Sequence, residues 1–140
     1  MIETHALEFD TAGENSILNI TDRVEKVLDA SKREGDGFVL LFLQSTTSAL
    51  TIMEFEQGLL LDLPTAMERV APKQAQYKHE QAWHDGNGHS HVKSALVGSS
   101  LTIPFSKKNG GLLLGQWQQV VLVEFDVRPR KRTLIVQVQC

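Results

Sequence analysis

The chain of 140 residues contains few of the residues that crosslink small proteins or anchor them in membranes. Its single cysteine, Cys140, excludes an internal disulfide and a zinc site built from cysteines. No apolar run approaches the ~20 residues of a membrane-spanning helix, and the longest, residues 38–43, has the length of a strand. We therefore expect one domain over residues 1–140, with no membrane as partner.

Basic charge is also scarce, since 14 Lys+Arg stand against 17 Asp+Glu and give a net charge of −3. A chain of this balance lacks the positive field that attracts nucleic acid, so we expect no nucleic acid as partner. The amino terminus has neither the basic nor the apolar stretch of a secretory signal, which predicts a cytoplasmic protein. Neither residues 98–100 nor residues 109–111 have the spacing of a nucleotide-binding loop, and we expect no organic cofactor.

The apolar pattern predicts helices set between strands early in the chain and strands alone at its end. The expected strands cover residues 2–9, 38–43, 46–53, 101–105, 112–114, 119–127 and 132–139. The expected helices follow Asp22, run over residues 54–71 with a break or kink at Pro64, and run over residues 90–97. Residues 38–43 are expected to be buried on both faces, and residues 72–88 to form a loop. This order predicts an α+β fold with a largely antiparallel sheet.

Histidine is the residue type whose placement is most informative. Four of the five histidines fall within thirteen residues, at His79, His84, His89 and His91. If the backbone there is extended, His89 and His91 point to the same side and can grip one ion, with His79 or His84 as third ligand. The alternative is a polar loop whose histidines face water or bond to the backbone.

Several charged and aromatic residues are further candidates. In residues 120–126, strand alternation places Glu124 among apolar residues, where it needs a histidine, lysine or metal partner unless that face is wet. Glu54 ends a strand and is equally an acid in the first turn of a helix. Lys93 either serves an anionic ligand or is a solvated lysine. Trp117 either lines a pocket or belongs to the core, and residues 128–132 form a charged hairpin tip.

Together these pieces resemble the YjbQ-like family, whose members are often called secondary thiamine-phosphate synthases. The matching segments are Ser45–Glu54, Tyr77–His79, Gly86–Lys93, Leu96–Pro104, Gly115–Gln118 and Glu124–Asp126. The resemblance implies a barrel-like antiparallel sheet with two or three helices, assembled as a homotrimer. It also implies a small phosphorylated metabolite as partner, in a reaction that joins a hydroxymethylpyrimidine diphosphate to a thiazole phosphate.

By position, the resemblance assigns catalytic roles to Glu54, Asn87, Lys93 and Glu124, substrate binding to Ser45 and Trp117, and a divalent metal, zinc first, to His79, His89 and His91. The family commonly has histidine at the position of Ser45, asparagine at Met53 and threonine at Gln116. Serine cannot replace imidazole as a ligand or as a base near pH 7. Three hypotheses follow: a thiamine-phosphate synthase-like transferase, a non-catalytic metal- or anion-binding module, and histidines that only connect subunits.

Overall fold

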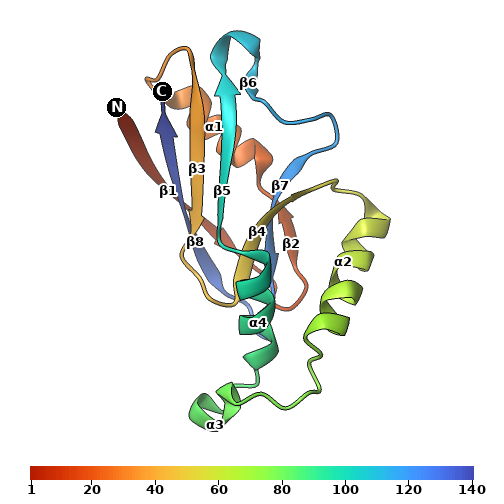
Figure 1. The fold of residues 1–140 in the computed structure, drawn as a ribbon. Helices are drawn as coiled ribbons and strands as arrows, with labels where there is room; N and C mark the ends of the chain where they lie inside the picture. The colour runs from red at the N-terminus through yellow and green to blue at the C-terminus, as the bar shows by residue number, and fades with distance from the viewer.

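The computed structural model describes residues 1–140 as an α+β fold in which antiparallel strands curl into a half-barrel (Figure 1). The strands are β1 (Ile2–Asp10), β2 (Ile17–Asn19), β3 (Asp36–Leu43), β4 (Ser48–Met53), β5 (Ser100–Ser106), β6 (Gly111–Leu112), β7 (Gln119–Glu124) and β8 (Lys131–Gln139). The helices are α1 (Thr21–Ala30), α2 (Gln57–Val70), α3 (His79–Trp83) and α4 (Gly88–Val97), with a 3₁₀ turn at Lys107–Asn109.

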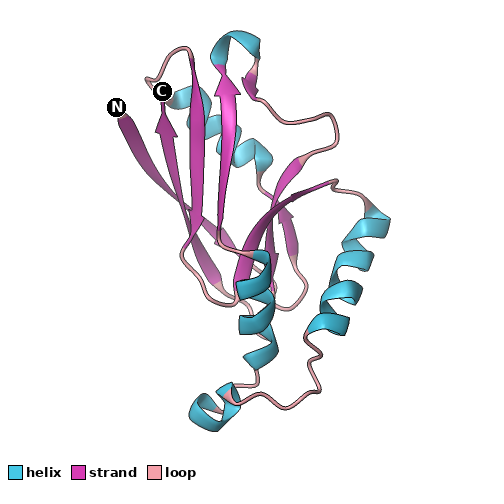
Figure 2. Cartoon of the chain, in the orientation of Figure 1, coloured by secondary structure: helices cyan, strands magenta, loops and turns pink.

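Two antiparallel sheets make up the half-barrel, with strand orders β1-β8-β3-β5-β6 and β2-β7-β4. Helix α1 packs with its apolar side, Val24 and Leu28, into the large core that both sheets share. Helix α4 lies against the smaller sheet, whereas α2 stands to one side of it and reaches the sheet through Leu63 and Met67, and α3 protrudes beyond them (Figure 2). The expected α+β fold with a largely antiparallel sheet is confirmed.

Strand β7 is buried on both faces and divides the two apolar clusters. Val120 and Leu122 belong to the large cluster of 17 buried residues. Val121 and Val123 belong to a second cluster with Met67 of α2. This second cluster attaches α2 and α4 to the sheet and thereby positions the polar residues of these two helices.

The expectation that residues 38–43 are buried on both faces is wrong. Their pattern alternates along β3, and Phe38 and Phe42 remain 38% and 46% exposed. No helix of the chain covers this face of the five-stranded sheet (Figure 1). The apolar run therefore has one face in the core and one face open to solvent.

Two expectations about the helices need correction. Helix α2 runs through Pro64 without a break, and Leu63 and Met67 on either side of this proline both pack on the second apolar cluster. Residues 72–88 are not all loop, since they contain the short helix α3, which brings the total to four α-helices.

Candidate functional site

Helix α4 determines where the histidines point. It begins at Gly88, two residues earlier than predicted, and Asn87 occupies the N-cap position. A Cβ at Gly88 would lie 2.6 Å from Tyr77 Cβ, so only glycine lets the preceding segment lie this close. The backbone of His89 and His91 is helical rather than extended, and two residues correspond to about 200° of rotation. The two imidazoles therefore lie on opposite sides of α4.

His79, Glu80 and Asp85 form a cluster of three converging ligand atoms on one side of α4. Nδ1 of His79 lies 3.5 Å from Glu80 Oε1 and 3.5 Å from Asp85 Oδ1. The three ligand atoms lie within 4.8 Å of one another, and His79 Nδ1 has no hydrogen-bond partner. Neutral imidazole and carboxylate oxygens are a donor set that suits zinc and other divalent ions.

His91 joins this cluster through ring contact. Its imidazole packs on that of His79, with ring centroids 4.3 Å apart. Burial and the neighbouring His79 lower the pKa of His91. Neutral imidazole is the form that coordinates a metal, so His91 is available to the cluster near neutral pH.

Asn87 lies between two carboxylates. It is 3% exposed, and its amide nitrogen lies 3.5 Å from Asp126 Oδ2. With the amide turned over, the nitrogen donates instead to Asp85 Oδ1 at 2.8 Å. The Asn87 nitrogen therefore faces Asp126 in one amide orientation and Asp85 in the other, and reaches one of the two carboxylates at a time.

A hydroxyl-lined groove opens beside His91. One cavity, of about 320 Å³, is lined by Ser45, Thr46, His91, Ser94, Ala95, Gly98 and Ser99. A second, of about 600 Å³, shares Ser45, Thr46 and Ser99 and extends to Arg132. Ser45 Oγ accepts hydrogen bonds from Ser48 Oγ at 2.6 Å and from the Thr47 amide at 3.2 Å. The structure thus places Ser45 and His91 in one groove.

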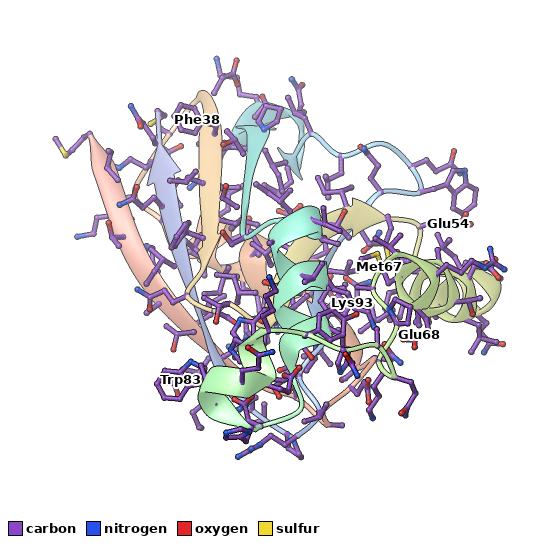
Figure 3. The ribbon with its side chains drawn as sticks, turned by 60° about the horizontal axis from the view of Figure 1, so that its bottom comes forward. Phe38, Glu54, Met67, Glu68, Trp83 and Lys93 are labelled. Carbon is purple, nitrogen blue, oxygen red and sulfur yellow. The ribbon has the colours of Figure 1, made fainter.

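Lys93 lies on the other side of α4, facing Glu68 of α2 (Figure 3), and His89 contacts Lys93. Lys93 is 2% exposed, and its Nζ lies 3.1 Å from Glu68 Oε2 and 3.3 Å from His89 Nδ1. Because lysine can only donate, Nδ1 accepts and the proton of neutral His89 lies on Nε2. Burial and the Lys93 cation lower the pKa of His89. His89 is thus separated from His79 and His91.

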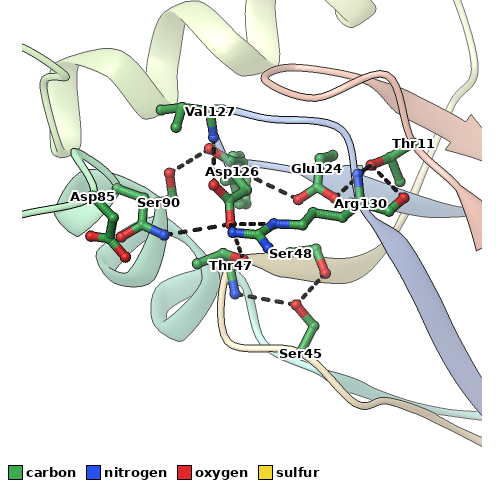
Figure 4. A network of polar contacts seen from close by, with 12 residues as sticks. Thr11, Ser45, Thr47, Ser48, Asp85, Ser90, Glu124, Asp126, Val127 and Arg130 are labelled. Carbon is green, nitrogen blue, oxygen red and sulfur yellow. Dashed lines mark hydrogen bonds and ion pairs between the residues drawn. The ribbon is translucent and has the colours of Figure 1, made fainter. Parts of the chain in front are cut away.

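Glu124 belongs to a buried polar network that includes Thr11 and Asp126 (Figure 4). Its charged partner is Arg132. Arg132 donates to both carboxylate oxygens of Glu124, at 2.8 and 2.6 Å, and Thr11 donates to one of them at 2.7 Å. Arg132 also donates to Thr47 at 2.7 Å, and Thr47 donates to Asp126 at 2.9 Å.

The expected hairpin tip at residues 128–132 is wrong, because β7 pairs with β2 and β4 whereas β8 pairs with β1 and β3. These residues instead connect the two sheets, and two of their arginines are paired with acids. Arg130 contacts Asp126 at 3.0 Å, and Arg132 holds Glu124.

Glu54 and Trp117 lie together, but not with the histidines. They line a cavity of about 680 Å³ at the far end of β4. Glu54 is six positions beyond Ser48 along β4, which corresponds to roughly 20 Å of strand. The predicted site residues therefore fall into separate places: the cluster near His79 with the Ser45 groove, the Lys93–His89 pair, the buried Glu124, and the cavity of Glu54 and Trp117.

Glu80 is the member of the metal cluster that the sequence did not single out. It follows His79 directly and also accepts a hydrogen bond from the Gly88 amide at 2.7 Å. An acid next to a histidine gives no pattern by itself, because the helical turn of α3 is what brings the two side chains together. None of the helices has the length and apolar character required to traverse a bilayer.

Comparison with known proteins shows similarity over almost the whole chain. Residues 5–140 match the family model described as UPF0047 protein YjbQ-like. A UPF0047 protein of Archaeoglobus fulgidus is 40% identical over 131 residues, covering 94% of this chain and 97% of the relative. A UPF0047 protein of Methanothermobacter thermautotrophicus is 34% identical over 137 residues, covering 98% and 92%. A YbjQ-like protein of unknown function from Sulfolobus solfataricus has a crystal structure that superposes with TM-score 0.86 at 26% identity, covering 99% and 98%.

Proposed function

The chain belongs to the UPF0047 YjbQ-like family, and from this premise we propose that it is an enzyme that holds a divalent cation, zinc first, at His79, Glu80 and Asp85. The observation that carries the proposal is the convergence of three possible ligand atoms within 4.8 Å of one another. Without a cation, the His79 Nδ1 atom faces two carboxylate oxygens and has no hydrogen-bond partner. A bound cation satisfies all three groups at once.

The substrate that suits the adjoining groove is a small phosphorylated metabolite. The groove offers the hydroxyls of Ser45, Thr46, Ser94 and Ser99, and it is bordered by Arg132, whose guanidinium also donates to Glu124 and Thr47. No carboxylate lines it, so it does not repel an anion. A divalent ion next to the groove supplies Lewis-acid stabilisation of phosphate charge. His91, which lines the groove and contacts His79, is the group positioned to exchange a proton with the bound metabolite.

The reaction that we propose is thiamine-phosphate synthase-like. A hydroxymethylpyrimidine diphosphate loses pyrophosphate while its carbon forms a bond to the nitrogen of a thiazole phosphate. In this proposal the groove binds the diphosphate, whereas Glu124 and Lys93 hold internal ion pairs and act structurally.

The experiment compares purified protein stripped by a chelator with protein reloaded with zinc. Both are incubated with the two phosphorylated substrates, and pyrophosphate release is measured. The proposal predicts release that depends on zinc and is lost in Asp85→Asn. Equal release from stripped protein, reloaded protein and Asp85→Asn contradicts it.

A second candidate function is a cation-binding module without catalysis. Serine stands at position 45, where the resembled family commonly has histidine. The groove therefore has His91 as its single imidazole. If Ser45→His does not raise pyrophosphate release above background while zinc still binds, the non-catalytic module is the better account.

We also propose that the chain self-associates as a homotrimer through the open face of the five-stranded sheet. Across this face Phe42 pairs with Ile135, and Ile135 pairs with Ala6. Phe38 pairs with Pro104 on the same face. Exposed contiguous apolar side chains of this kind mark interaction surfaces. The number of subunits follows from the family resemblance.

A further inference from the structure

The cavity lined by Glu54 and Trp117 is distant from the histidines and lies at the opposite end of the smaller sheet from them. It is bounded by the end of β2, the start of β7, the connection from β4 to α2 and the connection from β6 to β7. The last two connections lie side by side at one edge of the molecule (Figure 1). Its volume is about 680 Å³, which is enough for a small organic molecule.

Two aromatic side chains give this cavity a stacking surface. Trp117 is 65% exposed and Phe55 is 40% exposed, and both line the cavity. Because both side chains line one cavity, their rings offer an apolar surface on which a ligand can stack. The other lining residues are polar and comprise Asn19, Glu54, Glu56, Gln57, Gln116 and Gln119.

Every charged residue that lines the cavity is acidic. Glu54 and Glu56 line the cavity, and no lysine, arginine or histidine does. Glu56 accepts hydrogen bonds from the amides of Gly58 and Leu59 at 2.7 and 2.9 Å, which fixes its carboxylate at the start of α2. Glu54 has no such partner and its carboxylate is exposed. The cavity thus has one carboxylate free to pair with a ligand.

Amide groups complete the lining with both donors and acceptors. Asn19 donates to Gln119 Oε1 at 3.1 Å, which orders the floor of the cavity across β2 and β7. Gln57 and Gln116 supply further amides at its rim. A ligand with a hydroxyl or a carbonyl group finds partners here, whereas a phosphate meets two carboxylates and no cation.

From this lining we propose that the cavity of Trp117, Phe55 and Glu54 binds a small organic cation, such as a quaternary or protonated amine that also carries a hydrogen-bonding group. The cation lies against the indole face of Trp117 and pairs with the Glu54 carboxylate. Cations are attracted to the face of tryptophan more strongly than to other aromatic rings. This site is independent of the cation site proposed at His79, since about 20 Å of strand lies between Glu54 and Ser48, and Ser48 is the end of β4 that contacts Ser94 of α4.

The experiment compares choline with its neutral isostere 3,3-dimethylbutan-1-ol. Trp83 is the other tryptophan and is 71% exposed in α3, so Trp83→Phe leaves Trp117 as the reporter of indole fluorescence. Titration of this variant is expected to show saturable quenching by choline, with binding roughly tenfold tighter than that of the neutral isostere. Saturation-transfer NMR on the choline methyl groups gives a second measure that needs no tryptophan.

Three variants assign the effect to the residues. Glu54→Gln and Trp117→Ala are each expected to abolish the preference for choline or its saturation transfer. Glu8→Gln, which removes an exposed acid of β1, is the control and is expected to bind as the parent does. Circular dichroism shows whether each variant is folded, and Trp117→Phe keeps an aromatic ring if the alanine variant is not.

The proposal is overturned if choline and its isostere bind equally, if Glu54→Gln and Glu8→Gln behave alike, or if no saturation transfer is detected. Repetition in His79→Ala and after chelation separates this site from the proposed cation site. Unchanged choline binding in both supports an independent site. Loss of choline binding in both contradicts it.

Discussion

The imidazole of His91 on α4 packs on that of His79 on α3, with ring centroids 4.3 Å apart and an angle of 40° between the planes. Two protonated imidazoles at this distance repel each other, and burial together with His79 lowers the pKa of His91. The contact therefore favours the neutral form in which imidazole accepts a cation. It also connects the hydroxyl-lined groove at His91 to the carboxylates at Glu80 and Asp85.

Arg132 and Glu124 form a fully enclosed ion pair, whose loss we expect to destabilise the fold strongly. Arg132→Met leaves the Glu124 carboxylate buried without its cation and should lower the free energy of unfolding by about 3–5 kcal/mol. Urea denaturation at neutral pH measures the change. The control Arg128→Met removes an exposed arginine of the same turn and should change stability by about 0.5 kcal/mol or less. Equal effects of the two variants would show that the buried pair is not important for stability.

Asp126 should make stability depend on pH. Burial raises its pKa, but the Thr47 hydroxyl, the Arg130 charge and the Val127 amide outweigh burial and hold the pKa of Asp126 below its usual value. A carboxyl with a depressed folded pKa stabilises the fold above its unfolded pKa of about 4, and this contribution is lost as the pH falls through the folded pKa.

Asp126→Asn should therefore be less stable than the wild type near neutral pH, by about 2 kcal/mol. The difference between the two should shrink as the pH falls below about 4. Urea denaturation at a series of pH values measures it. A difference that stays constant from neutral to acidic pH would contradict a charged Asp126.

The Lys93–Glu68 pair should respond asymmetrically to substitution. Lys93 is buried while the Glu68 side chain is 48% exposed. Glu68→Gln leaves the Lys93 ammonium buried with only His89 beside it and should cost about 1–2 kcal/mol, a figure reduced by the exposure of Glu68. Lys93→Met removes the buried charge together with its need for a partner and should cost less.

The double variant Glu68→Gln/Lys93→Met tests the reason for this asymmetry. It should be close in stability to Lys93→Met, because no buried charge remains to be neutralised. Chemical denaturation of the three variants gives the comparison. A double variant whose loss equals the sum of the two single losses would argue against the pairing.

The open sheet face should control self-association. Phe42→Arg places a charge at the centre of the apolar side chains on this face and should convert the assembly to a monomer. Light scattering after size-exclusion chromatography should give three times the 15.6 kDa of one chain for wild type and for the control Ala30→Arg at the exposed end of α1. A wild-type monomer at micromolar concentration would refute the trimer.

Strand and helix types followed from the sequence where the apolar period was regular. The exposure of Phe38 and Phe42 could not be predicted, because an unbroken apolar run has the same sequence whether its second face is covered by the chain itself or left open. Pro64 shows the reverse, since α2 continues through this proline despite the local signal of a break.

For the site, the histidine segment was identified but its geometry was not. The separation of His89 from His91 depends on α4 beginning at Gly88, which requires close contact with Tyr77 that no local pattern reveals. Glu80 belongs to the cluster because the turn of α3 brings its side chain next to His79. The pairing of Glu124 with Arg132 depends on how the two sheets pack together, because β7 and β8 belong to different sheets, and no local pattern reveals this arrangement.

The measurement that tests the central claim most directly is zinc binding by isothermal titration, with metal analysis of the same samples. His79→Ala and Asp85→Asn each remove one ligand of the cluster. His84→Ala is the matched control, because His84 is an exposed histidine of the same segment and lies outside the cluster. We predict one zinc per chain in wild type and in His84→Ala, with affinity reduced by at least roughly tenfold in His79→Ala and Asp85→Asn. Zinc binding of equal strength in all four proteins, or in none of them, would contradict the cation site.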